Sequence, residues 1–186
     1  MKTLILNGSP RKDGDTVALI EELKKYLKGE ILELNPFYNK IAPCDDCRAC
    51  WKKPKCIIRD DMDKVYTDDY DILVVASPLH MSSLPGPLVN LASRLQVYYA
   101  SREKLHAPIE RRKKEAVMIL VGGGDGSPSV AIRQTKTIFS LLWAKLADEN
   151  VVMSMDTDHV PAEEDQTAIE QVRDVALRLN GAYGMA

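Results

Sequence analysis

Apolar and polar positions along the 186-residue chain form two kinds of segment that follow one another in turn. Short apolar runs of the kind found in buried strands occupy residues 3–6, 30–34, 71–76, 116–121 and 151–155. Apolar residues at helical spacing mark 15–27, 129–147 and 163–179, and helices are also expected from Pro85 and from 60 to about 67. Because parallel strands need such crossovers, the pattern predicts a parallel sheet with helices on both faces.

Composition narrows the class of protein. Basic and acidic side chains nearly cancel, 25 against 27, so the balance gives no indication of a nucleic-acid partner. No apolar run approaches the length of a membrane span, and the stretch after Lys2 is too short for a secretion signal. We expect one domain over residues 1–186, located in the cytoplasm, and we expect the basic run 111–114 to be a solvated loop.

Three loops that follow predicted strands carry the informative residues. They span residues 8–16, 77–83 and 122–127. Ligands of open parallel sheets bind outside the carboxyl ends of the strands, where these loops begin. We therefore expect all three loops to contribute to one site.

The first loop has the parts of a phosphate site. Ser9 and Thr16 supply hydroxyls, Arg11 supplies a guanidinium, and a turn at Gly14 exposes amides at the start of a helix. The spacing is neither G-x-x-x-x-G-K-[ST] nor G-x-G-x-x-G, so a terminal monophosphate is favoured over a triphosphate or pyrophosphate. An ordinary strand-to-helix turn capped by Asp15 explains the pattern about as well.

The other two loops are weaker indications when each is taken alone. Ser77-Pro78 and the glycines 122–124 are common turn residues and are more often structural. On a shared rim, however, glycines let a flat ring approach the backbone, and amides there can bond to its polar edge.

All four cysteines lie in one segment without clear periodicity, residues 36–59, and form the pattern C-x2-C-x2-C-x5-C. Such density in a cytoplasmic protein favours metal or redox chemistry over disulfides. The spacing fits four-cysteine ligation of a [4Fe-4S] centre, whereas zinc sites more often use two separated pairs. Zinc, disulfide-prone thiols and an inert structural loop remain open. The predicted metal ligands are Cys44, Cys47, Cys50 and Cys56.

Three stretches together resemble a known family: GSPRKDGDT, SPLHMSSLPGPLVNLASRL and PCDDCRACWKKPKC. They are similar to the flavodoxin-fold NADPH-dependent FMN reductases, and especially to the iron-sulfur flavoproteins, over nearly the whole chain. The resemblance implies a flavodoxin-like, doubly wound five-stranded parallel sheet in the order 2-1-3-4-5, with the cysteine-rich insertion 36–59 after the second strand. It also implies a homodimer or homotetramer with flavins near the subunit contacts.

The resemblance further implies where an FMN lies. Its phosphate is expected in the loop 8–16, and its ring against residues 78–82 and 122–124. The cofactor-binding residues are then Ser9, Arg11, Gly14, Asp15, Thr16, Ser77, Pro78, Leu79, His80, Met81, Ser82, Gly122, Gly123 and Gly124.

Two positions depart from the family pattern. Relatives commonly have Gly-Asn-Thr where this chain has Gly14-Asp15-Thr16, which places a carboxylate beside the phosphate unless Asp15 caps the helix. Relatives usually have a tyrosine where His80 stands, so the ring contact and any proton donation at this position are open.

These observations favour an FMN-dependent oxidoreductase or electron carrier of the iron-sulfur flavoprotein type, with no acid-base side chain assigned. NAD(P)H is expected as a transient donor, and ferredoxin or a quinone are candidate redox partners. One alternative is an NAD(P)H-dependent FMN or quinone reductase without a cluster. Another is a non-catalytic, zinc-binding module of the same fold.

Overall fold

The computed structural model describes residues 1–185 and contains a five-stranded sheet. The strands are β1 (Lys2–Asn7), β2 (Glu30–Leu34), β3 (Ile72–Pro78), β4 (Lys114–Val121) and β5 (Ala144–Ser154). They are hydrogen-bonded in the order β2-β1-β3-β4-β5, and every neighbouring pair is parallel. This confirms the predicted flavodoxin-like fold class.

Residues that alternate along the central strands divide the core into two layers. Leu4 and Leu6 of β1 belong to the apolar cluster on one face of the sheet, and Ile5 belongs to the cluster on the other face. Both faces are therefore buried, which is why the central strands read as continuous apolar runs rather than as alternating patterns.

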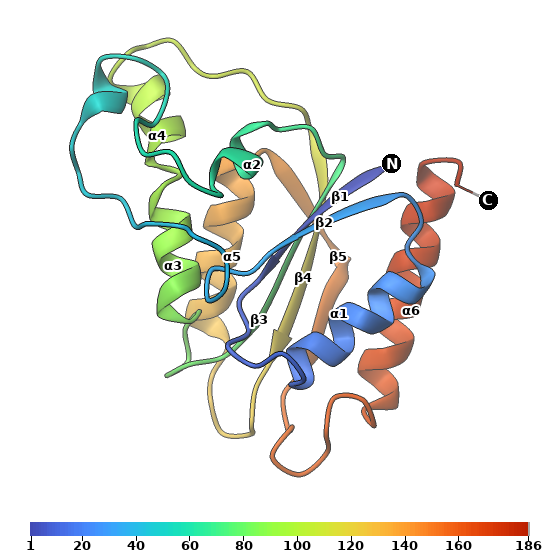
Figure 1. Ribbon diagram of the computed structural model, residues 1–186. Coiled ribbons are helices and arrows are strands. Elements are labelled where there is room, and N and C mark those ends of the chain that lie inside the picture. Colours follow the sequence, from blue (N-terminus) through green and yellow to red (C-terminus); the bar gives the residue numbers. More distant parts are fainter. Residues whose placement is uncertain (186) are drawn as a thin grey trace.

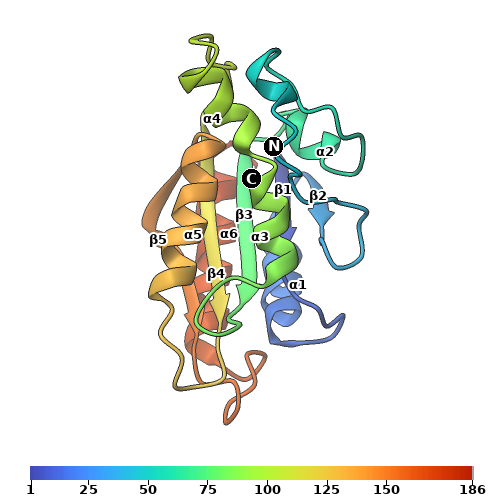
Figure 2. The ribbon, with the colours of Figure 1, turned by 90° about the vertical axis from the view of Figure 1, so that its left-hand side faces the viewer.

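Helices cover both faces of the sheet. The helices are α1 (Asp15–Tyr26), α2 (Asp63–Tyr66), α3 (Gly86–Ser93), α4 (Gln96–Glu103), α5 (Ser129–Leu141) and α6 (Gln166–Ala182). Figure 1 shows α1 and α6 together on one side of the sheet, with α3 and α5 on the other, and the turned view in Figure 2 shows α3 and α5 side by side. Leu19 and Val172 bring α1 and α6 into one apolar cluster, and Leu88 and Ile138 bring α3 and α5 into the other.

The helix predicted over residues 129–147 was wrong at its carboxyl end. α5 ends at Leu141, Trp143 has a φ of 56°, and β5 already begins at Ala144. The first part of β5 is half-exposed and polar, and it is held as a strand because Ala144 pairs with Lys114 of β4. Backbone pairing with a distant strand overrides the local helical spacing here.

Two other boundaries moved by a few residues. The last helix begins at Gln166 rather than Glu163, because the Asp165 carboxylate caps it by accepting a hydrogen bond from the Ala168 amide. The helix expected from Pro85 is divided into α3 and α4, which meet at Arg94 and Leu95.

The cysteine-rich segment lies outside the sheet, between β2 and β3, and contains one 3-10 turn, Ala49–Trp51. Figure 1 shows the segment leaving the carboxyl end of β2 and running to α4, so that its 3-10 turn lies at the end of the molecule opposite the carboxyl ends of the strands. Only Ile41 and Cys50 of this segment pack against the apolar core. The insertion is thus attached to the fold mainly by polar contacts.

Candidate functional site at the carboxyl ends of the strands

The three predicted loops meet around one cavity of about 340 Å³ at the carboxyl edge of the sheet. The residues that line it are Ser9, Pro10, Arg11, Thr16, Pro78, Leu79, His80, Val121, Gly122, Gly123, Thr157 and Asp158. Among the predicted cofactor-binding residues, Gly14, Asp15, Ser77, Met81, Ser82 and Gly124 lie in the same loops but do not line the cavity.

Hydrogen bonds within the first loop fix its shape. The buried Ser9 donates its amide to the Asn7 side chain (2.8 Å) and its hydroxyl to the Arg11 carbonyl (2.9 Å). The Asn35 side chain, which follows β2, donates to the Ser9 carbonyl (2.8 Å). These hydrogen bonds hold the loop in one shape between β1 and the start of α1.

Asp15 is held by an ion pair and a backbone contact rather than by the helix end. One carboxylate oxygen of Asp15 lies 2.9 Å from Arg11 Nη2, and the other accepts a hydrogen bond from the Ala162 amide (3.1 Å). The residue that caps α1 is Gly14, and no side chain bonds to the helix amides there. The interpretation of Asp15 as a helix cap was therefore wrong.

The second loop contains a tight turn of unusual composition. His80 and Ser83 exchange backbone hydrogen bonds (2.9 and 3.0 Å), and the two residues between them, Met81 and Ser82, have positive φ angles of 51° and 63°. Glycine or asparagine normally occupies such positions. The Met81 side chain is fully exposed, which leaves a large apolar group in solvent at the edge of the cavity.

The third loop is joined to a segment that the sequence analysis missed, the loop after β5. Thr157 donates its amide to the Gly122 carbonyl (3.0 Å), and Asp158 donates its amide to the Gly123 carbonyl (3.1 Å). A Cβ added at Gly123 would lie 2.6 Å from a carboxylate oxygen of Asp158, so glycine permits this close approach. Since β5 is parallel to β4, its carboxyl end had to reach the same rim, and that rule alone would have indicated these two residues.

A second cavity, of about 350 Å³, lies in the cysteine-rich segment, and all four cysteines line it together with Trp51. Cys47 is exposed and the other three are half-buried. The pKa of Cys50 is raised, first by burial and then by the neighbouring cysteines. Within residues 1–185, no three His, Cys, Asp or Glu side chains converge closely enough to hold a single metal ion.

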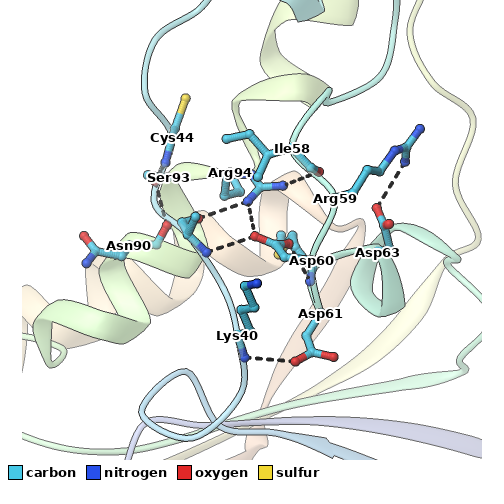
Figure 3. Close-up of polar contacts among 12 residues, drawn as sticks. Lys40, Cys44, Ile58, Arg59, Asp60, Asp61, Asp63, Asn90, Ser93 and Arg94 are labelled. Atoms are coloured by element: carbon cyan, nitrogen blue, oxygen red, sulfur yellow. Dashed lines mark hydrogen bonds and ion pairs between the residues drawn. The ribbon is translucent and has the colours of Figure 1, made fainter.

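A buried arginine anchors this segment. Figure 3 shows Arg94, between α3 and α4, reaching across to Asp60, with which it forms an ion pair of 2.8 Å whose side chains are almost fully buried. Burial by itself lowers the pKa of Arg94, but Asp60, Tyr66 and Cys56 raise it above its ordinary value. Arg94 therefore stays charged, and no pattern in the sequence indicated its role.

The basic run 111–114, expected to be a solvated loop, is partly built into the fold. Lys114 begins β4, is 3% exposed, and donates hydrogen bonds to the Arg112 and Leu142 carbonyls. Arg111 lies over the rings of Tyr98 and Trp143. Two of these four charges are therefore structural and are not available to attract an anion.

Comparison with known proteins identifies the family. The family model described as NADPH-dependent FMN reductase matches residues 1–158. The chain belongs to this family. Like its family, it is a flavin-dependent oxidoreductase that uses FMN.

Several relatives of this chain are named iron-sulfur flavoprotein. One of Methanosarcina thermophila is 28% identical over 96% of this chain and 93% of its own length. One of Methanocaldococcus jannaschii is 31% identical over 75% of this chain and 71% of its own length. Among solved structures, an FMN-dependent NADH-azoreductase of Bacillus anthracis in complex with FMN has a TM-score of 0.70 at 19% identity, over 96% of this chain and 99% of that one.

The first loop of the rim cavity combines hydroxyls, a guanidinium and the start of a helix. The buried residues Ser9 and Thr16 line the cavity together with Arg11, and Thr16 lies in the first turn of a helix of 12 residues. A Cβ at Gly8 would lie 2.8 Å from Leu88 and from Ser77, so this turn also depends on glycine.

Among the helices that the structure describes, none is long and apolar enough to span a membrane.

Proposed function

We propose that this protein is an FMN oxidoreductase of the iron-sulfur flavoprotein type, which passes electrons between FMN, a [4Fe-4S] cluster and an external partner. The observation that carries the proposal is that all four cysteines of the chain line one cavity, in a protein whose rim cavity joins three loops suited to FMN. Bound FMN accepts a hydride or single electrons, and a cluster accepts single electrons.

The residues of the rim would hold FMN by its two ends. Ser9, Arg11, Thr16 and the amides at the start of α1 would bind the phosphate, because hydroxyls, a guanidinium and the positive helix end all favour a dianion. Residues 78–82 and the glycines 122–124 would lie against the flat ring. Thr157 and Asp158 join this set as residues that hold the glycine loop.

The arrangement of the thiols favours a cluster over zinc. Zinc draws its ligands to about 2.3 Å from one point, whereas each thiolate of a cubane binds a different iron. The four cysteines line one cavity of about 350 Å³, which leaves room between the thiols for a group larger than a single ion. This distribution supports the larger group.

One specific observation favours a second candidate, an NAD(P)H-dependent reductase of FMN, quinones or azo compounds without a cluster. The structural similarity covers almost the full length of a protein named as an FMN-dependent NADH-azoreductase. The rim cavity would serve that activity equally well, with NAD(P)H binding transiently over the flavin. A zinc-binding module without flavin is the weakest candidate, because the chain belongs to an FMN reductase family.

Iron, acid-labile sulfide and FMN assays on protein purified anaerobically test the proposal. The expected result is about four iron atoms and one FMN per chain, in line with cubane stoichiometry. Cys56→Ser should remove iron and keep FMN, because Cys56 lies in the segment at the opposite end from the rim. Full FMN without iron in the anaerobic wild type would rule out the cluster and support the second candidate.

Titrations with NADH, NADPH, a ferredoxin and a quinone would identify the physiological donor and acceptor. Sedimentation of the flavin-loaded protein would test the predicted homodimer or homotetramer.

A further inference from the structure

The guanidinium of Arg94 connects the two ends of the cysteine-rich segment. Its Nη1 donates to the Ala42 carbonyl (3.0 Å) and its Nη2 donates to the Ile58 carbonyl (3.0 Å). Ala42 lies two positions before Cys44, and Ile58 lies two positions after Cys56. One side chain therefore closes the loop that contains all four cysteines.

The neighbouring residues complete this attachment. Ser93, the last residue of α3, accepts a hydrogen bond on its hydroxyl from the Cys44 amide (2.9 Å), and Asp60 accepts from Arg94 and from the Ala42 amide (2.9 Å). Figure 3 shows these contacts gathered at the carboxyl end of α3. The segment thus has a fixed base, which its low content of helix and strand would not provide.

The Nε–H of this arginine makes no hydrogen bond within the described part of the chain. Arg94 is 1% exposed, it lines the cysteine cavity, and its Nε is buried without a partner among the residues described. A buried charged donor is costly to leave unpaired. All four cysteines line the same cavity as Arg94, so sulfur is the acceptor at hand.

We propose that Arg94 is a positioning residue for the iron-sulfur group, holding both ends of its loop and donating its Nε–H to a sulfur in the cavity. This inference rests on the proposed function. Hydrogen bonds to sulfur and nearby positive charge stabilise the more reduced, more negative state of a cluster. Arg94 therefore raises the reduction potential of the group, and Asp60 offsets only part of its charge.

Three variants separate this role from simple support of the fold. Arg94→Lys keeps the charge but has no Nε–H and no fork to reach two carbonyls at once. Arg94→Gln removes the charge, and the double variant Arg94→Gln with Asp60→Asn removes the buried pair together, so that no buried carboxylate is left unpaired. The matched control is Arg59→Gln, which breaks an exposed pair with Asp63 (3.3 Å) on the same segment.

Reduction potentials are to be measured by anaerobic dye titration of the cluster signal, with iron release to a chelator as a second readout. Arg94→Gln and the double variant should lower the equilibrium constant for reduction of the cluster at least tenfold. For one electron this corresponds to a fall of 59 mV in the reduction potential. Arg94→Lys should shift it less but release iron at least tenfold faster than wild type. Arg59→Gln should change neither value more than about twofold, since exposed pairs contribute little.

The possible results distinguish a failure of the cluster assignment from a failure of the role given to Arg94. A wild-type protein without iron after anaerobic purification overturns the cluster, and this inference with it. A wild type with iron, accompanied by Arg94 variants that keep wild-type potential and iron release, overturns only the role of Arg94. Faster iron release from Arg94→Lys with FMN retained, together with a lowered reduction potential in Arg94→Gln and in the double variant, supports it.

Discussion

Replacing Asp15 by asparagine tests how the rim binds a phosphate. In the structure Asp15 forms an ion pair with Arg11, with 2.9 Å between Nη2 and the carboxylate. The Arg11 side chain is 66% exposed, so it has room to turn away from Asp15. Asparagine keeps an oxygen that can accept the Ala162 amide hydrogen bond, so the loop contact at 3.1 Å should survive. The substitution therefore removes a negative charge with little change of shape.

The expected gain in FMN affinity is worked from two contributions. A partly exposed ion pair is worth about 0.5 kcal/mol, and this pair no longer has to be broken when Arg11 turns to the phosphate. Removing a like charge close to a dianion near the surface adds about 0.5 kcal/mol more. Together they predict about fivefold tighter binding of FMN, since 1.4 kcal/mol is tenfold.

Flavin fluorescence titration of the apoprotein would measure this change. The gain should shrink as salt is raised, because charges near the surface are screened. Asp13→Asn is the matched control, since Asp13 is an exposed carboxylate of the same loop, and its effect should be under about twofold. Unchanged or weaker FMN binding in Asp15→Asn would refute the reasoning and would mean that the ion pair orients Arg11 for the phosphate.

Four further substitutions test the fold and its titrating groups. Gly29→Ala should lower the free energy of unfolding in urea by more than about 1 kcal/mol, since the φ of Gly29 is +98° and a Cβ would collide with a backbone carbonyl. Gly181→Ala should raise it by about 0.5 kcal/mol, because Gly181 lies in α6 with open space around it. Equal stabilities of the two variants would contradict this. Burial alone raises the pKa of Asp60, but backbone amides and an arginine lower it below its ordinary value, so its stabilisation is full above about pH 4 and is lost as the pH falls through the folded pKa. Asp60→Asn should flatten the acid side of the stability curve, and an unchanged slope would argue against the assignment. The pKa of His159 is raised above 6.5 by its hydrogen bond to Asp156, and NMR titration of Asp156→Asn should show it falling toward that value; a pKa that stays high would exclude this cause.

The sequence predicted the elements whose cause is local or follows from parallel topology. β1, β3 and β4 were recognised because burial on both faces leaves an uninterrupted apolar run. The first half of β5 was taken for helix because its residues are polar and half-exposed, and only pairing with β4 holds them as a strand. An edge strand of this kind carries little periodicity of its own.

The residues of the candidate site also fall into those that the sequence predicted and those that it did not. The three loops that follow β1, β3 and β4 were predicted to share one rim, and the cavity that joins them agrees with this. Thr157 and Asp158 were missed because their loop lacks the glycines and hydroxyl pattern of a phosphate site. Arg94 was missed because an arginine in an amphipathic helix is normally exposed, and its partner Asp60 is 34 residues away.

The attachment of the cysteine-rich segment has a consequence for protein engineering. Because the segment supplies no strand and little of the core, we expect that it can be transferred to another protein of this fold. A graft that transfers only the cysteine loop would lack the hydrogen bonds that hold it in place. Those come from Ser93 and Arg94, at the end of a helix far along the chain. Such a graft must therefore transfer residues that are far apart in the sequence: the loop, Asp60, and the two residues at the end of α3.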